Sequence, residues 1–125
     1  MNVATILIVD DEPLNRLLLT TILKHGGYET VEAADADSGL AQLERHRADL
    51  AVVDLSLPGT SGTELIRRIR RTRDAAELPL LLYTASEIDP ATRDFMDAYG
   101  VAGAIPKPCD PEVVEAAIEA ALRRP

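Results

Sequence analysis

Short apolar runs alternate with longer segments of helical periodicity along this chain, and the pair recurs five times. The alternation predicts βαβ units, because parallel strands need a crossover connection that is usually a helix. Runs 6–9, 50–53 and 80–82 are continuously apolar, as expected of central strands covered on both faces. Run 29–33 alternates and predicts an edge strand, while run 101–105 is interrupted by glycine and predicts the fifth strand. We therefore expect an α/β fold, a doubly wound five-stranded parallel sheet with helices on both faces.

The helical segments begin at recognisable start signals. Ser61 to Glu64 form a capping box, and Asp89-Pro90 and Asp110-Pro111 each pair an acidic N-cap with a proline at the first helical position. The second helix is expected at about 37–45. The first begins at Pro13, ends at Gly26-Gly27, and has apolar residues at the i, i+3, i+4 and i+8 spacing of one helix face: Leu14, Leu17, Leu18 and Ile22.

The composition narrows the class of protein. A chain of 125 residues with 46% hydrophobic residues has the size and balance of one globular domain. Its 13 Lys and Arg against 21 Asp and Glu give a net charge of −8, which argues against direct binding of nucleic acid, because that depends on Lys and Arg displacing counterions. The single cysteine, Cys109, excludes an internal disulfide framework and suits a reducing compartment, so the expected location is the cytoplasm. No segment is expected to enter a membrane.

Polar side chains follow four of the five predicted strands. Asp10-Asp11-Glu12 follow the first strand, Asp54 the third, Thr84 the fourth, and Lys107 lies after the fifth. In an open parallel sheet the carboxyl ends of the strands meet at one edge, where ligands bind. Crowded carboxylates favour a hard divalent cation such as Mg²⁺, which prefers one or two carboxylates together with a phosphate oxygen. Asp54 is then a candidate nucleophile for a phosphoryl group, with Thr84 and Lys107 as donors.

Each of these residues alone has a simpler interpretation. Asp10-Asp11-Glu12 before Pro13 could complement the positive end of a helix dipole. Asp54 could be a loop acid, Thr84 a strand-end hydroxyl and Lys107 a solvated charge. Their shared placement at strand ends favours one site over four unrelated residues.

The sequence resembles the response-regulator receiver domains of bacterial two-component signalling, which include chemotaxis regulators, from its first strand to its last helix. The matching segments are Val9-Asp10-Asp11-Glu12-Pro13, Val53-Asp54-Leu55-Ser56-Leu57-Pro58-Gly59 with Gly62, Tyr83-Thr84-Ala85, and Lys107-Pro108. The resemblance implies the flavodoxin-like strand order 2-1-3-4-5. It also implies that residues 1–125 are a single receiver domain, with no output domain in this chain.

The resemblance implies a role for each matching residue. Asp54 would be the phosphoacceptor, receiving its phosphoryl group from a sensor histidine kinase or a histidine phosphotransfer protein. Lys107 and Thr84, with Ala85 beside it, would bind the phosphoryl group and act in the switch. Asp11, Asp54 and the Ser56 backbone carbonyl would bind Mg²⁺ directly, and Asp10 would act through a coordinated water. Structural roles are implied for Pro58, Gly62 and Pro108. The Lys107-Pro108 peptide would be cis.

The chain departs from the family at Ala104, where an aromatic residue or His is usual. Without that side chain the coupled threonine-aromatic switch cannot work in the usual way, so the signal would travel through Thr84 and the loop after the fourth strand, or by another route. Pro106 and Cys109 are a second departure and predict a stiff, slim end to the fifth strand. A pseudo-receiver that acts without phosphorylation is therefore an alternative, against which the intact site residues argue.

The last helix predicts an association surface. Glu112, Glu115 and Glu119 form one narrow stripe, which leaves an apolar circumference wider than burial alone requires. We expect the last strand and the helices that begin at Pro90 and Pro111 to contact an output domain, a downstream protein or a second copy of the chain.

One class of enzyme and one class of electron carrier share parts of this sequence pattern. A Mg²⁺-dependent aspartyl phosphatase or phosphotransferase would have an Asp-x-Asp nucleophile motif after its first strand and a substrate cap, whereas this chain has adjacent Asp10-Asp11 and no cap-sized insertion. A flavin carrier needs a hydroxyl-rich phosphate loop where this chain has Asp10-Asp11-Glu12. We expect a regulatory phosphoacceptor that catalyses only its own phosphorylation and dephosphorylation, not an enzyme acting on other substrates.

Overall fold

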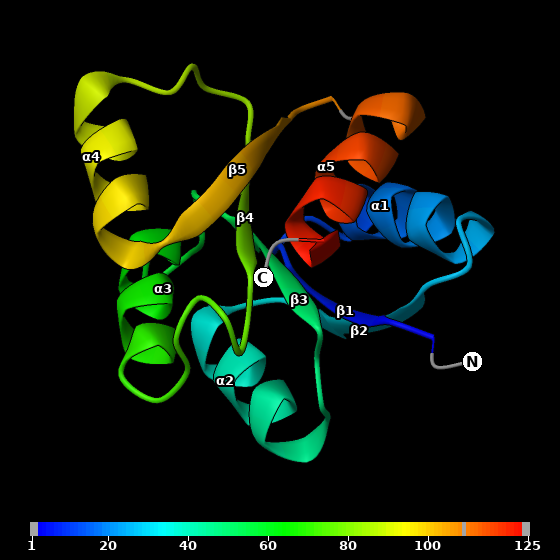
Figure 1. The fold of residues 1–125 in the computed structure, drawn as a ribbon, viewed down its shortest axis with the longest axis horizontal. Helices are drawn as coiled ribbons and strands as arrows, with labels where there is room; N and C mark the ends of the chain where they lie inside the picture. Colours follow the sequence, from blue (N-terminus) through cyan, green and yellow to red (C-terminus); the bar gives the residue numbers. More distant parts are fainter. Residues whose placement is uncertain (1–2, 109, 124–125) are drawn as a thin grey trace.

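The computed structural model describes residues 3–108 and 110–123, and ten helices and strands alternate along them (Figure 1). Each of the five strands is followed along the chain by a helix, as the alternation of the sequence predicts. The elements are β1 Thr5–Val9, α1 Pro13–His25, β2 Glu29–Ala33, α2 Ala36–Arg45, β3 Leu50–Asp54, α3 Gly62–Arg70, β4 Leu80–Thr84, α4 Pro90–Tyr99, β5 Val101–Pro106 and α5 Pro111–Arg123.

The five strands form one sheet of order β2-β1-β3-β4-β5, and every neighbouring pair is parallel. The predicted fold class and strand order are confirmed. Strand β3 lies at the centre and is buried at all five positions, whereas the alternating strand β2 lies at an edge and is partly exposed. The order in which strands are added to the sheet reverses between β1 and β3, so the carboxyl ends of these two strands border the position where ligands bind in such sheets.

Two apolar clusters hold the helices against the sheet. Figure 1 shows α1 and α5 together on one face, and α2, α3 and α4 on the other. The residues of each strand divide between the faces by alternation: Leu7 and Val9 pack with α2 and α3, while Ile6 and Ile8 pack with α1 and α5. Because both faces are covered, the central strands are apolar at successive positions, as in other parallel sheets.

The helix starts largely follow the sequence signals. Asp89 accepts a hydrogen bond from the Thr92 amide at 2.7 Å, and Asp110 accepts one from the Glu112 amide at 2.8 Å. The full capping box predicted at Ser61 was wrong: Ser61 accepts from the Glu64 amide at 3.2 Å, but the Glu64 carboxylate pairs with arginines of α3 instead. A complete box occurs at the start of α2, formed by Asp35 and Ser38.

Most of the apolar positions used to predict α1 lie outside its buried face. Leu14, Leu17 and Leu18 are 72%, 61% and 44% exposed. The buried residues of α1 are Leu19, Thr20, Ile22 and Leu23, so of the four positions Ile22 alone faces the sheet. The helix was predicted correctly, but three of the four side chains used to recognise it form an exposed apolar patch, which we call the α1 leucine patch.

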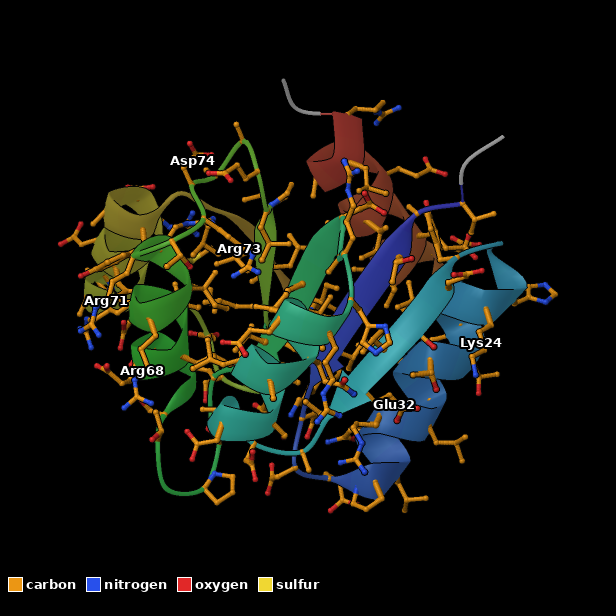
Figure 2. All side chains as sticks on the ribbon, turned by 90° about the horizontal axis from the view of Figure 1, so that it is seen from below. Lys24, Glu32, Arg68, Arg71, Arg73 and Asp74 are labelled. Atoms are coloured by element: carbon orange, nitrogen blue, oxygen red, sulfur yellow. The ribbon has the colours of Figure 1, made fainter. Side chains whose placement is uncertain are left out.

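Several arginines lie near the end of α3, and two of them donate hydrogen bonds to backbone carbonyls of other elements. The half-buried Arg70 donates to backbone carbonyls of Tyr99 at 2.6 Å, Leu78 at 2.7 Å and Gly100 at 3.1 Å, which ties α3 to the end of α4 and to the loop before β4. Figure 2 shows Arg71 on the outer side of α3, whereas Arg73 lies toward α2 and donates to the Leu43 carbonyl.

Within residues 3–108 and 110–123, no helix combines the length and the apolar character needed to cross a bilayer. The interpretations of Cys109 concern a position outside the described residues.

Candidate functional site

Four strand ends place the polar residues singled out in the sequence at one edge of the sheet. Asp10 and Asp11 follow β1, Asp54 is the last residue of β3, Thr84 is the last residue of β4, and Lys107 follows β5. The strands are parallel and in register, with Asp54 opposite Tyr83 and Thr84 opposite Pro106. The edge therefore brings together side chains that are almost a hundred residues apart in the chain.

Three carboxylates form the centre of the site. Asp10, Asp11 and Asp54 each place one carboxylate oxygen within 4.8 Å of the others. Asp10 is fully buried and Asp54 is 3% exposed, whereas Asp11 is exposed. Acids are rarely this buried unless they are paired or bind a metal, so the cluster is unlike the solvated acids elsewhere on the chain.

Lys107 joins two of the carboxylates. Its Nζ lies 3.2 Å from Asp10 Oδ2 and 3.2 Å from Asp54 Oδ2. The Lys107 backbone amide donates to the Thr84 carbonyl at 2.9 Å, which fixes the lysine to the end of β4. The peptide between Lys107 and Pro108 is cis. The ammonium is thus held between the two buried acids from a position one residue beyond the sheet.

Backbone amides orient the two buried carboxylates. Asp54 Oδ1 accepts from the Ser56 amide at 3.0 Å, and Asp10 Oδ1 accepts from the Glu12 amide at 2.9 Å. In each residue the other oxygen, Oδ2, faces Lys107. Glu12 itself caps α1 by accepting from the Leu14 amide, so the helix-dipole interpretation holds for Glu12 but does not account for the buried Asp10.

The surroundings of Asp54 oppose its charge. Burial raises the pKa of the Asp54 carboxyl above its ordinary value, and the carboxylate of Asp10 also raises it. The hydrogen bond from the Ser56 amide and the ammonium of Lys107 lower it, but by less than the raising effects. A cation bound at the cluster would favour the ionised form of this carboxyl.

The donor set fits a hard divalent cation. All three side chains offer carboxylate oxygens, which Mg²⁺ prefers. Asp10 Oδ2 is buried and, among the described residues, it accepts no hydrogen bond of good geometry, although it lies in ion-pair contact with Lys107. A buried carboxylate oxygen without a hydrogen bond is costly, so this atom has capacity for a further electropositive neighbour.

Thr84 and Ala104 line a hollow between the loop after β4 and the end of β5. The hollow has a volume of about 330 Å³, and the loop after β4 forms much of its wall. Thr84 is buried, and its Oγ1 accepts from the Ser86 amide at 3.1 Å. Ala85 is exposed at the start of that loop. The methyl group of Ala104 leaves open the space next to the Thr84 hydroxyl, on the face of β5 that also contacts α4.

Gly62 shapes the loop that follows Asp54. A Cβ at this position would overlap the carbonyl oxygen of Asp54 and would lie 3.0 Å from Leu55 Cα. Only glycine therefore lets α3 start so close to the end of β3. Pro58 is exposed in the same loop, and the backbone of Ser56 lies at its beginning.

Sequence reasoning missed two neighbours of the site. Arg16 of α1 donates to the Asp10 carbonyl at 2.6 Å and pairs with Glu32 at 3.3 Å. The ring of Tyr83 lies against Lys107, with Nζ 4.6 Å from the ring centroid. Tyr83 stood in the matching segment with Thr84, and an aromatic residue in an otherwise aliphatic strand was the only signal that set it apart.

The sequence matches one family model and several curated proteins. The family model described as response regulator receiver domain matches residues 6–119. The chain is 36% identical over 120 residues to the phosphate regulon transcriptional regulatory protein PhoB of Pseudomonas aeruginosa, covering 96% of this chain and 52% of that protein. It is also 36% identical over 120 residues to the transcriptional regulatory protein AfsQ1 of Streptomyces coelicolor, again covering 96% and 52%. The chain thus spans about half the length of these curated relatives.

Solved structures show the same fold. The chemotaxis protein CheY4 of Vibrio cholerae superposes with a TM-score of 0.88 at 27% identity, covering 96% of this chain and 99% of that one. A CheY-like receiver domain protein of Methanospirillum hungatei gives a TM-score of 0.88 at 30% identity, covering 97% and 94%.

Proposed function

This chain belongs to the response regulator receiver domain family, and from that premise we propose that it is a phosphoacceptor of a two-component phosphorelay, with Asp54 as the residue phosphorylated. The observation that carries the proposal is the contact of one ammonium, Lys107 Nζ, with Asp54 Oδ2 and Asp10 Oδ2 at 3.2 Å each. Such a group can neutralise charge that arrives on a phosphoryl group beside Asp54.

The proposed transfer uses Asp54 Oδ2 as the nucleophile. A bond forms between this oxygen and phosphorus while the bond from phosphorus to the donor nitrogen of a phosphohistidine breaks, and the imidazole leaves with the electron pair and takes up a proton. The Ser56 amide holds the other oxygen of Asp54 in place at 3.0 Å. Lys107 and the Thr84 hydroxyl are the donors for the phosphoryl oxygens.

Asp10, Asp11, Asp54 and the Ser56 carbonyl are the groups that would hold Mg²⁺ in this proposal. When bound, the cation neutralises charge on the incoming phosphoryl group. Without it, the buried carboxylates repel one another and the approaching phosphoryl group.

The signal is proposed to leave through Thr84. When its hydroxyl turns toward a phosphoryl group on Asp54, the bond to the Ser86 amide is lost and the loop after β4 must rearrange. With Ala104 facing the hollow, this loop rather than an aromatic side chain transmits the change to α4, β5 and α5. That face is the proposed contact for an output domain, a downstream protein or a second copy of the chain.

The partners follow from the same proposal. A sensor histidine kinase or histidine phosphotransfer protein supplies the phosphoryl group. The names of the relatives describe transcriptional regulation, which this chain, at −8 net charge, would serve through an output partner and not by contacting nucleic acid itself. We place the protein in the cytoplasm and assign it no enzymatic substrate beyond its own phosphoryl group. A pseudo-receiver remains the second candidate, favoured only by Ala104.

Magnesium-dependent phosphoryl uptake tests the proposed function. The protein incubated with acetyl phosphate and Mg²⁺ is expected to gain one phosphoryl group, measured by intact-mass spectrometry. Chelation of Mg²⁺ by EDTA is expected to abolish the gain, because the carboxylate cluster then repels the phosphoryl group. An unmodified protein in both conditions would support the pseudo-receiver instead.

The α1 leucine patch is the proposed docking surface for the protein phosphodonor. Leu14, Leu17 and Leu18 are exposed on the helix that begins three residues after Asp10, and adjacent exposed apolar side chains mark association sites. A helix of the donor lying along this patch would place its phosphohistidine near Asp54.

A double substitution of two patch leucines by aspartate separates docking from chemistry. Leu14→Asp together with Leu18→Asp is expected to slow phosphoryl transfer from a histidine phosphotransfer protein by about tenfold or more, because two apolar contacts are lost and charge is added to the interface. Transfer from acetyl phosphate, which needs no docking surface, should stay unchanged. Equal slowing with both donors would show that the patch affects the site itself and would refute the docking role.

A further inference from the structure

We propose that Tyr83 is a positioning residue for phosphoryl transfer, because its ring holds the ammonium of Lys107 at the acidic cluster. This inference rests on the proposed function of Asp54. Lys107 Nζ lies 4.6 Å from the centroid of the Tyr83 ring. The same nitrogen contacts Asp10 Oδ2 and Asp54 Oδ2. The ammonium is therefore bounded by two carboxylates and one ring face.

The sheet dictates why Tyr83 reaches this position. Tyr83 pairs in register with Asp54 of β3 and with Ile105 of β5. Its side chain belongs to the apolar cluster beneath α1 and α5, and the residue is 1% exposed. The backbone carbonyl of Tyr83 also accepts from the Leu55 amide at 3.2 Å, which ties it to the residue after Asp54. The ring is thus fixed by strand pairing and by packing.

A ring face is suited to hold an ammonium that must act on another group. It attracts the cation through the electron density of the ring, yet it takes none of the strong hydrogen bonds that the ammonium can donate. The Lys107 side chain is 17% exposed, so water screens the attraction little. The ring orients the ammonium, and the N–H donors of the ammonium stay available to Asp10, Asp54 and a phosphoryl oxygen.

An aliphatic side chain of similar volume would fill the same core space without this attraction. Lys107 has a long, flexible stem, and holding it in one place costs side-chain entropy. In the absence of the ring, the ammonium is expected to spend more time away from the site. The effect should be on phosphorylation rate and should depend on the ring, not on the hydroxyl.

Two substitutions separate the ring from the space it fills. Tyr83→Leu is expected to slow phosphorylation by acetyl phosphate and Mg²⁺ by about five- to tenfold, the range of a partly desolvated cation-π contact. Tyr83→Phe, which keeps the ring face, is expected to retain the rate of the unaltered protein to within about twofold. Urea unfolding of both variants measures the loss of stability separately. Equal rates for all three proteins, with phosphoryl uptake intact, would overturn the positioning role but leave the proposed function standing.

A double-substitution cycle tests whether Tyr83 acts through Lys107. The affinity for the phosphoryl mimic fluoroberyllate with Mg²⁺ is compared in Tyr83→Leu, Lys107→Met and the double variant. The effect of Tyr83→Leu is expected to disappear when Lys107 is replaced, because the two residues then share no interaction to lose. A full, additive effect in the Lys107→Met background would show that Tyr83 supports the site only through packing.

If Tyr83→Leu does not fold, the proton chemical shifts of Lys107 test whether its ammonium lies over the ring. Protons above an aromatic ring resonate upfield of their ordinary positions. The side-chain protons next to Nζ of Lys107 are expected to be shifted upfield in the unaltered protein and in Tyr83→Phe. Ordinary shifts in both would place the ammonium away from the ring and overturn the inference. Failure of the unaltered protein to take up any phosphoryl group would instead refute the proposed function.

Discussion

Asp54→Asn is expected to abolish phosphoryl uptake from acetyl phosphate, whereas Asp37→Asn is expected to leave it unchanged. An amide is a far weaker nucleophile than a carboxylate, and it offers Lys107 no charge to pair with. Asp37 is the matched control because it undergoes the same chemical change on α2, where its side chain is 89% exposed and has only a 3.7 Å contact with Arg68. Uptake is measured by intact mass after identical exposure to the donor.

Asp54→Asn also has an expected effect on the stability of the fold. Burial raises the pKa of the Asp54 carboxyl, so its ionised form is disfavoured in the folded protein. A group with a raised pKa in the folded state makes folding less favourable once the pH is above that value. Asp54→Asn is therefore expected to fold at least as well as the unaltered protein at neutral pH, so that loss of uptake would reflect the lost nucleophile and not unfolding. Full labelling of Asp54→Asn would contradict the assignment of the phosphoacceptor.

Gly62→Ala is expected to lower the free energy of unfolding by about 3 kcal/mol, the upper part of the range for overpacked sites. The added Cβ would overlap the Asp54 carbonyl and approach Leu55 Cα to 3.0 Å, and both neighbours are backbone atoms that cannot move aside as a flexible side chain can. Alanine is the better helix former by at most about 1 kcal/mol, so the clash decides the sign. Urea denaturation measures the change.

Gly103→Ala is the control for this substitution. A Cβ at Gly103 would lie 3.5 Å from Leu81 Cδ2, an ordinary contact, so its unfolding free energy should change by less than about 1 kcal/mol. Equal losses at the two positions would show that the tight approach of α3 to the end of β3 does not set the stability of this loop.

The sequence predicted the sheet and the location of the site well, for identifiable reasons. Short continuous apolar runs are typical of strands covered on both faces, which indicated β1, β3 and β4. Because the strands are parallel, their carboxyl ends lie at one edge of the sheet. The residues at or just after those ends, Asp10, Asp54, Thr84 and Lys107, must therefore share that edge. The placement of these residues in the structure follows from topology alone.

Side-chain orientation and long-range contacts were not accessible in the same way. The leucines of α1 repeat with helical spacing, but spacing cannot tell which face meets the sheet, and the residues that do so are Leu19, Ile22 and Leu23. Nothing in the local sequence singles out Arg70, because its partners, Tyr99 and Gly100, lie about thirty residues away. The contact of Tyr83 with Lys107 joins two strand ends and likewise has no local signal.

The location of the acyl phosphate tests the central proposal most directly. Borohydride reduces an aspartyl phosphate to homoserine, which marks the modified residue in a peptide map of the protein treated with acetyl phosphate and Mg²⁺. We predict homoserine at position 54 and at no other acid. Homoserine in place of Asp10 or Asp11 would contradict the account and point to the aspartyl phosphatase chemistry that the sequence left as an alternative, and the absence of any homoserine would contradict phosphorylation altogether.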